Sequence, residues 1–284
     1  MTADRATTVA VIGGGRMGAG IAQVFAVAGH HVVVSESGTP AAAALQRVRA
    51  GLQRAADKGA LPGPVDDILA RVSVVPSITE SPRDAVLLVE AVPEDTQLKR
   101  AVLTEVAQIV GADCVLATNT SSLSITALAA DLPEPSRFLG MHFFNPVPAS
   151  TLVEIVAGAA TDEGIVQRAT GWVAELGKQS VVVRDSPGFA TSRLGVLLGL
   201  EAIRMLEEGV ADAESIDRAM ELGYRHPMGP LRSTDLVGLD VRLAIAEYLS
   251  STLGDRFTPP KLLRDKVARG ELGRKAGQGF YRWS

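Results

Sequence analysis

A histidine and a glutamate near the middle of the chain have the side chains best suited to move a proton. His142 lies in the stretch GMHFFNPVP, and Glu154 follows shortly afterwards, where it interrupts the apolar run LVEIV. A buried carboxylate is costly unless it is paired or hydrogen-bonded, so we expect Glu154 to have a partner, and His142 is the nearest titratable candidate. An imidazole held by a carboxylate can take the proton of an alcohol while a hydride leaves the carbon. For a lone histidine, the alternative is a structural role.

A second group of polar side chains directly follows the apolar strand that ends at Thr118. It comprises Asn119, Thr120, Ser121 and Ser122. In a doubly wound fold, the loops that leave the carboxyl ends of the strands form the ligand crevice, so the amide and the hydroxyls are placed to contact a ligand. An N-cap for a helix that begins near Ser124 accounts for one of these residues but does not require all of them.

The glycine-rich stretch near the N-terminus predicts a binding loop for a dinucleotide. An apolar strand, Val9–Ile12, is followed at once by Gly13, Gly15 and Gly18 in the pattern G-x-G-x-x-G. Such glycines permit a tight turn and let the backbone approach a pyrophosphate, while the N–H groups that begin the next helix point at the phosphates. We include Met17, which lies inside the motif, among the residues expected to contact the cofactor.

An acidic residue stands where a ribose-binding carboxylate is expected. The second apolar strand, His31–Val34, ends at Ser35 and Glu36, about twenty positions beyond the glycine loop. The alternative is that Glu36 is a solvated turn residue before Gly38. Because residues 37–39 offer no arginine for a 2′-phosphate, the sequence favours NAD over NADP.

Composition limits the class of protein. The 284 residues are 46% hydrophobic and 21% charged, which favours a sizeable core and two domains, and the formal net charge of -4 gives no reason to expect nucleic acid as a partner. The single cysteine, Cys114, excludes an intramolecular disulfide and suits a reducing compartment; its apolar neighbours indicate a small buried residue. We find no secretory leader and no apolar run of membrane-spanning length. We therefore predict a cytoplasmic protein without a membrane partner, and we assign no metal ligands.

The order of elements predicts an α/β fold with an N-terminal, doubly wound Rossmann-type sheet, followed by a smaller all-helical C-terminal domain. Apolar strands alternate with helices up to about residue 186, and strand-like runs then disappear. We predict an NAD-binding domain over residues 1–186 and a helical domain over residues 187–284. The strands expected after the first two are Val72–Val75, Val86–Val92, Cys114–Thr118, Phe138–Met141, Leu152–Val156 and Ser180–Val183.

Two helices carry patterns that leave alternatives open. On the helix expected over Pro40–Lys58, Arg54 and Lys58 lie near one face with Arg47, either as a solvated face or as a site for an anionic part of the substrate. The helix expected over Ala190–Glu208 carries a broad apolar stripe that fits burial in the core or against another subunit, and we expect core packing. That stripe comprises Leu194, Leu197, Leu198, Ala202 and Met205.

Nearly the whole chain resembles the L-3-hydroxyacyl-CoA dehydrogenase family, which includes bacterial 3-hydroxybutyryl-CoA dehydrogenases. The motifs that carry the resemblance are VAVIGGGRMGAGIAQVFAVAGHHVVV, LVEAVPEDTQLK, TNTSSLSI, GMHFFNPVP, LVEI, DSPGFATSR, EEGVADAESIDRAMELGYRHPMGPL, DLVGLD and LGRKAGQGFYRW. Together they are highly specific. The resemblance implies an oxidoreductase that interconverts 3-hydroxyacyl and 3-oxoacyl thioesters by hydride transfer with NAD.

The resemblance also implies roles for single residues. His142 would be the catalytic base and acid with Glu154 as its partner, Ser121 would hydrogen-bond the substrate near the nicotinamide, and Asn145 would shape the pocket. Glu36 would bind the adenosine ribose. The further positions that would touch NAD are Glu94, Lys99 and Lys275, together with Asn119 in the ligand crevice.

Three of these NAD contacts also have a structural alternative. For Glu94 and Lys99 the alternative is a solvated helix start with a charge pair, and for Lys275 a surface loop. Family members dimerise through the helical domain and hold the acyl thioester between the domains, so a homodimer is implied.

One position departs from the family pattern. Where relatives have an asparagine that reaches the active site, this chain has Ser192, which keeps a hydroxyl but lacks the amide's paired donor and acceptor. We retain Ser192 among the catalytic residues. The departure keeps two alternatives open: a biosynthetic dehydrogenase of a polar hydroxyacyl group carried on an acyl carrier protein, and a catalytically impaired NAD-binding relative.

Overall fold

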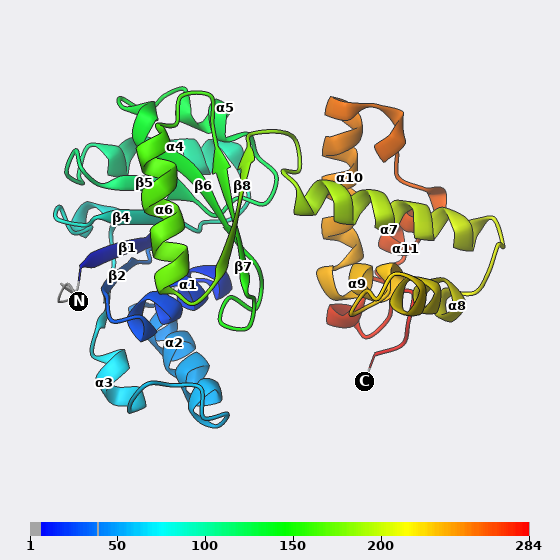
Figure 1. Cartoon of the computed structure of the whole chain (residues 1–284), viewed down its shortest axis with the longest axis horizontal. Coiled ribbons are helices and arrows are strands. Elements are labelled where there is room, and N and C mark those ends of the chain that lie inside the picture. Colours follow the sequence, from blue (N-terminus) through cyan, green and yellow to red (C-terminus); the bar gives the residue numbers. More distant parts are fainter. Residues whose placement is uncertain (1–6, 39, 284) are drawn as a thin grey trace. The chain divides into compact units, whose positions relative to one another are not determined.

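The computed structural model describes residues 7–38 and 40–283, and the chain divides into two compact units (Figure 1). Unit 1 is Met1–Asp185 and unit 2 is Ser186–Ser284. Thr39, one of the residues used to favour NAD over NADP, lies outside the described residues. Each unit is described by itself below.

Unit 1 is built on a single eight-stranded sheet with the strand order β3-β2-β1-β4-β5-β6-β7-β8. All neighbouring strands are parallel except β6 and β7, which are antiparallel. The first six positions reproduce the order of a doubly wound dinucleotide-binding sheet, so the predicted fold class is confirmed. The strands are β1 (Thr8–Ile12), β2 (His31–Ser35), β3 (Val72–Val75), β4 (Leu87–Glu90), β5 (Val115–Thr118), β6 (Phe138–Phe143), β7 (Leu152–Ala157) and β8 (Gln179–Arg184).

Helices cover the sheet of unit 1 on both sides. They are α1 (Arg16–Val27), α2 (Ala41–Ala56), α3 (Val65–Leu69), α4 (Thr96–Ala107), α5 (Ile125–Ala129) and α6 (Glu163–Glu175). Helix α6 packs on the end of the sheet formed by β6, β7 and β8, whereas α1 and α2 pack together near β2 and β3 (Figure 1). The side chain of Ser124 accepts a hydrogen bond from the Ala127 N–H and caps α5, so the alternative that one of residues 119–122 is the N-cap of this helix was wrong.

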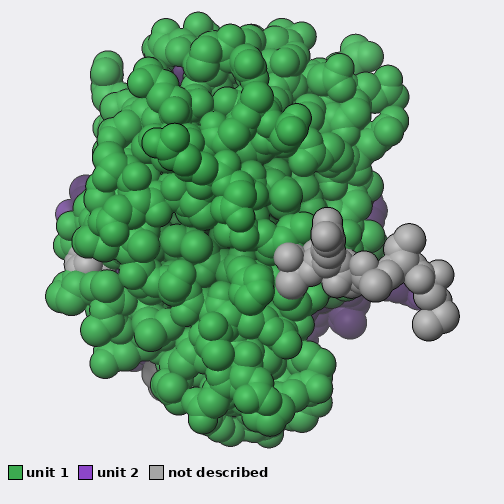
Figure 2. Space-filling view, turned by 90° about the vertical axis from the view of Figure 1, so that its left-hand side faces the viewer, with its two compact units in different colours: residues 1–185 green, residues 186–284 purple. Residues whose placement is uncertain are grey.

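The central strands form the core of unit 1. Every residue of β4, β5 and β6 is buried, as expected for parallel strands that are covered on both faces, while the edge strand β8 is largely exposed. Figure 2 shows one face of this unit, in green, as a closely packed surface. Cys114 is buried as expected, and burial raises the pKa of its thiol to about 12.

Unit 2 is helical. Its helices are α7 (Thr191–Glu207), α8 (Ala213–Arg218), α9 (Pro230–Val237), α10 (Leu239–Leu253) and α11 (Lys261–Ala268). Helix α8 ends at Arg218, because the backbone continues as a π-helical turn over Ala219–Gly223. The sequence analysis missed α9, which begins with a proline at its first position, where a missing N–H costs nothing.

The prediction that the apolar stripe of α7 packs into the core was wrong for two of its residues. Leu194 is 66% exposed and Leu197 is 37% exposed. The buried face lies on the other side of the helix, where the absence of side chains at Gly195 and Gly199 lets Thr234 and Arg242 approach the backbone. None of the described helices has the length and apolar character required to cross a membrane.

Candidate active site

His142 and Glu154 face each other across the one antiparallel pair of strands in the sheet. They are directly opposite in the register of β6 and β7, so their side chains project from the same face at close range. The His142 Nδ1 lies 2.8 Å from the Glu154 Oε2, and the residues are only 6% and 0% exposed. This confirms the pairing expected from the sequence. A bond of this length between a ring nitrogen and a buried carboxylate is typical of a charge-assisted hydrogen bond.

The position of this pair along the strand matters for its chemistry. His142 is the last residue but one of β6, which runs parallel to β5, so it lies at the carboxyl edge of the parallel strands. Ligands of doubly wound sheets bind outside this edge. The ring of Phe144 lies 4.3 Å from the imidazole, centre to centre, and packs against it. The histidine is therefore held by a carboxylate on one strand and an aromatic ring just beyond the end of its own.

A carboxylate from the loop after β4 organises the loop after β5. The Glu94 Oε1 accepts hydrogen bonds from Thr120 Oγ1 at 2.6 Å, from the Ser121 N–H at 3.0 Å, and from the Ser121 Oγ at 3.3 Å. The Ser122 Oγ also donates to it, at 3.4 Å. All three hydroxyl-bearing residues singled out in the sequence, Thr120, Ser121 and Ser122, thus donate to one acceptor.

Beneath this loop lies a buried ion pair that the sequence analysis did not identify. Glu90, the last residue of β4, is fully buried and accepts hydrogen bonds from Lys99 Nζ at 2.8 and 3.1 Å, from Thr118 Oγ1 at 2.6 Å and from the Val92 N–H at 2.7 Å. Lys99 is 1% exposed, so the alternative of a solvated helix start was wrong for this residue. It also forms the expected charge pair with Glu94, at 3.3 Å. The sequence did carry a signal for this ion pair, because the stretch LLVE places an acid at the end of an apolar run.

The side-chain oxygen of Asn119 has a role in the fold. Its Oδ1 accepts a hydrogen bond from the Phe143 N–H at 2.9 Å, which ties the ends of β5 and β6 together beside His142. Asn145 follows on the same loop with an exposed side chain, and its peptide bond to Pro146 is cis.

The loop that carries Asn145 is anchored at both its faces. Val147 is buried against α1, where a methyl group added to Gly20 would lie only 2.9 Å from the valine Cβ. On the other side, the Lys178 ammonium donates to the carbonyl oxygens of Val147 and Ser150, and burial lowers the pKa of this lysine.

The glycine loop after β1 fits a bound pyrophosphate. Gly13 has a φ of +98°, and a methyl group on it would lie 2.9 Å from the Ala91 carbonyl oxygen; one on Gly18 would lie 1.8 Å from the Gly13 oxygen. A methyl group on Gly15 would meet nothing within 4 Å. Helix α1 begins after Gly15 without a side-chain cap or an acid in its first turn, so its backbone N–H groups are oriented for an anion. Met17, the second residue of α1, packs partly against the core.

Glu36 bridges the glycine loop and the turn after β2. Its Oε2 accepts a hydrogen bond from the Gly14 N–H and its Oε1 accepts one from the Gly38 N–H, each at 2.7 Å. Arg47 donates to the Gly14 carbonyl oxygen at 3.0 Å, so it belongs to this loop and not simply to a solvated face. Arg54 is exposed on α2, and Lys58 is exposed beyond the end of that helix.

The remaining predicted site residues belong to unit 2. Ser192 lies in the first turn of α7 and is partly exposed. Lys275 lies in the short turn Arg274–Ala276, where its Nζ donates to Asp240 Oδ2 at 2.7 Å. Both side chains of this ion pair are partly exposed.

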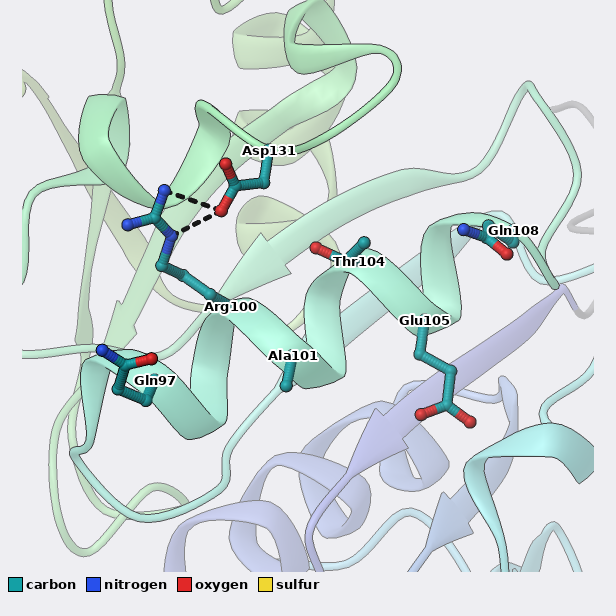
Figure 3. A pocket seen from close by; sticks show the side chains of 7 residues that line it. All are labelled: Gln97, Arg100, Ala101, Thr104, Glu105, Gln108 and Asp131. Carbon is teal, nitrogen blue, oxygen red and sulfur yellow. Dashed lines mark hydrogen bonds and ion pairs between the residues drawn. The ribbon is translucent and has the colours of Figure 1, made fainter.

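An open hollow of about 720 Å³ lies on unit 1 beside α4 (Figure 3). It is formed by α4 together with Asp131, whose carboxylate pairs with Arg100. None of the predicted site residues lines it. The lining residues are Gln97, Arg100, Ala101, Thr104, Glu105, Gln108 and Asp131. The hollow is therefore not formed by the predicted site residues.

Comparison with known proteins gives consistent matches over both units. Residues 8–186 match the model of the 3-hydroxyacyl-CoA dehydrogenase NAD binding domain, and residues 188–283 match that of the 3-hydroxyacyl-CoA dehydrogenase C-terminal domain. The probable 3-hydroxybutyryl-CoA dehydrogenase of Deinococcus radiodurans is 41% identical over 278 residues, which are 96% of this chain and 99% of that protein.

A solved structure and a second relative extend these matches. The crystal structure of (S)-3-hydroxybutyryl-CoA dehydrogenase from Ralstonia eutropha has a TM-score of 0.93 and 38% identity, and the match covers 99% of this chain and 100% of the other. The 3-hydroxyadipyl-CoA dehydrogenase of Escherichia coli is 39% identical over 280 residues, which are 97% of this chain and 59% of that protein.

Proposed function

Since the chain belongs to the 3-hydroxyacyl-CoA dehydrogenase family, we propose that it interconverts (S)-3-hydroxyacyl-CoA and 3-oxoacyl-CoA with NAD as the hydride carrier. The observation that supports this most directly is the buried His142–Glu154 pair at the carboxyl edge of a dinucleotide-binding sheet. A proton acceptor in that place is what the oxidation of an alcohol requires.

NAD, when bound, supplies the redox chemistry, and the protein supplies binding, orientation and proton transfer. We propose that Gly13, Gly15, Gly18 and Met17 hold the pyrophosphate. The absence of a side-chain cap on α1 and the open space beside Gly15 support this. We propose that Glu36 binds the adenosine ribose. The residues proposed to face the rest of the cofactor are Glu94, Asn119, Ser121 and Lys275, and the buried Lys99 acts through its ion pair with Glu94.

His142 is the residue that moves the proton. Its Nδ1 donates to Glu154, which leaves Nε2 as the nitrogen that takes the hydroxyl proton of the substrate. The carboxylate holds the ring in one orientation and stabilises the imidazolium that forms. In the direction of reduction, the same Nε2 returns a proton to the 3-oxo oxygen.

The other residues of the site bind the substrate. The Ser121 hydroxyl turns from Glu94 to donate to the oxygen on the reacting carbon, and the hydrogen bonds from the Ser121 N–H and the Thr120 hydroxyl to Glu94 keep the loop in place. Asn145 shapes the pocket, and Ser192 contacts the acyl group. Arg54 and Lys58 are exposed cations that suit the phosphates of the CoA moiety.

We also propose a homodimer formed through unit 2. Leu194 and Leu197 stand exposed on the outer face of α7, as does Val241 on α10. Apolar side chains that protrude in this way are typical of a surface covered by another subunit.

The test is to follow NADH formation with 3-hydroxybutyryl-CoA, with the same acyl group on an acyl carrier protein, and with free 3-hydroxybutyrate. We expect turnover of the CoA thioester with NAD, much slower turnover with NADP, and none of the free acid. A protein that binds NAD but forms no NADH from any 3-hydroxyacyl thioester contradicts the proposal. Faster turnover of the carrier-protein thioester would identify that thioester, and not the CoA thioester, as the substrate.

A further inference from the structure

The helical unit contains a buried arginine whose side chain has no hydrogen-bond partner among residues 186–283. Arg242, on α10, is 6% exposed, and its Nε is buried without a hydrogen bond. The Nε is the guanidinium nitrogen that is buried without a partner among the described residues. Burial lowers the pKa of Arg242 to about 10, so the group stays charged at neutral pH. A buried charge that lacks a counter-charge is costly to keep.

The buried acids of unit 2 do not neutralise this charge. Asp217 and Asp235 each accept several hydrogen bonds, and all their described donors are backbone N–H groups or aromatic side chains. Asp240 pairs with Lys275. The donors to Asp217 and Asp235 are Leu231, Arg232, Phe280, Tyr281 and Trp283. The anion that Arg242 lacks is therefore not supplied by these side chains.

The guanidinium lies along one strip of α7. A methyl group on Gly199 would be 3.7 Å from the Arg242 Nε, and one on Gly195 would be 3.6 Å from its Nη1. The end of the side chain thus points toward the start of α7, where Ser192 continues the same strip at helical spacing. Leu194 and Leu197 lie on the opposite face of the helix, so the strip is separate from the apolar surface proposed for the dimer.

We propose that Arg242 binds a carboxylate group on the strip of α7 formed by Ser192, Gly195 and Gly199. The guanidinium is a planar fork of donors that matches the two oxygens of a carboxylate, and the glycines let the guanidinium itself lie close to the helix backbone. The Ser192 hydroxyl adds a polar group at the end of the strip. A long apolar acyl chain would leave the buried charge unpaired and so is the wrong occupant.

This inference rests on the proposed function for the source of the carboxylate. The substrate can bring it, as the far end of a 3-hydroxyacyl chain, or a free carboxylate can bind in its place. The adipyl group named for one relative shows that the chemistry of the family extends to such chains.

The first arm of the test compares substrates of equal chain length. We expect wild-type kcat/KM for 3-hydroxyadipyl-CoA to exceed that for 3-hydroxyhexanoyl-CoA by about tenfold to a hundredfold, the range for a hydrogen-bonded charge. Arg242→Met should bring this ratio close to one, and Arg242→Lys, which keeps the charge but not the fork, should give an intermediate ratio. Arg218→Met, at an exposed arginine of the same unit, should leave the ratio as in the wild type.

The second arm measures the melting temperature with and without free adipate. A rise in the wild type that is absent in Arg242→Met identifies a free carboxylate as the occupant, whereas a substrate preference without this rise identifies the acyl chain. Arg242→Met should melt no lower than the wild type, because it removes an unpaired buried charge. If this variant does not fold, the substrate preference and the rise in melting temperature are both measured on Arg242→Lys.

The inference is overturned if the wild type shows neither the substrate preference nor the rise with adipate, or if the arginine variants retain them. Absence of turnover with every thioester overturns the proposed function instead, so the two failures are distinguishable.

Discussion

Replacing the carboxylate behind the histidine tests whether the buried pair performs the proton transfer. Glu154→Gln keeps the size of the side chain but removes its charge. At 2.8 Å, the charge attracts an imidazolium by about 6 kcal/mol at an effective dielectric constant of about 20, which is an upper limit. A hydrogen bond to a charged group measured by mutation contributes about 1.5–3 kcal/mol, the lower limit. Between these limits, we take about 3–4 kcal/mol as the transition-state stabilisation that the Glu154 charge supplies.

This free energy corresponds to a decrease in kcat of about a hundredfold to a thousandfold, since about 1.36 kcal/mol is a factor of ten. The assay is the initial rate of NADH formation with saturating 3-hydroxybutyryl-CoA, together with the dissociation constant of NAD, which should hardly change. The matched control is Glu175→Gln, in a second histidine–glutamate pair, where Glu175 is half-exposed and lies 3.4 Å from His30. That variant should retain wild-type activity.

A double variant makes the reasoning refutable. If Glu154 acts only through the imidazole, the change to glutamine should lower the rate in the wild type but have almost no further effect in His142→Ala, itself about a hundredfold slower or more. Equal effects of Glu154→Gln in the two backgrounds would show that the carboxylate acts independently of His142. A large fall in melting temperature in the single variant would show that it only stabilises the fold.

Three further outcomes follow from the rest of unit 1. Glu36→Ala should lower the preference for NAD over NADP, read from kcat/KM with each cofactor, by about tenfold or more, and an unchanged preference would exclude the ribose contact. Glu90→Gln should cost about 3–5 kcal/mol of unfolding free energy in urea, because it leaves the buried Lys99 without its nearest counter-charge, whereas Asp131→Asn in an exposed pair should cost under about 1 kcal/mol. Because the pKa of the Cys114 thiol is raised to about 12 in the folded protein, the unfolded chain loses this proton first, so stability should fall as pH rises from about 9 by at most roughly 1.4 kcal/mol per pH unit. Urea unfolding of Cys114→Ala over the same pH range should lack this contribution.

The sequence alone was sufficient wherever the argument depended on neighbours along the chain. The glycine loop, the acid after the second strand and the alternation of strands and helices follow from local spacing, and the sheet confirms the predicted fold class. The pair of His142 and Glu154 was also accessible, since a carboxylate in an apolar run demands a partner and the nearest histidine was a short loop away.

Other features depended on which elements become neighbours in space. The α7 stripe looked like a core face, but the glycines on the other side of the helix admit Thr234 and Arg242, so Leu194 and Leu197 face outward. Helical periodicity shows that a stripe exists, but not which side the other helices approach.

The sequence therefore determined which residues could bind a dinucleotide and move a proton, because backbone periodicity and the chemistry of single side chains are local properties. Only the tertiary structure decided that Glu90 and Lys99 form a buried pair, that Asn119 is bound to the Phe143 N–H, and that the Arg242 Nε is buried without a partner among the described residues. The physical reason is that the cost of a buried polar group depends on the partners that other strands and helices bring within hydrogen-bonding distance, and these partners are far away along the chain.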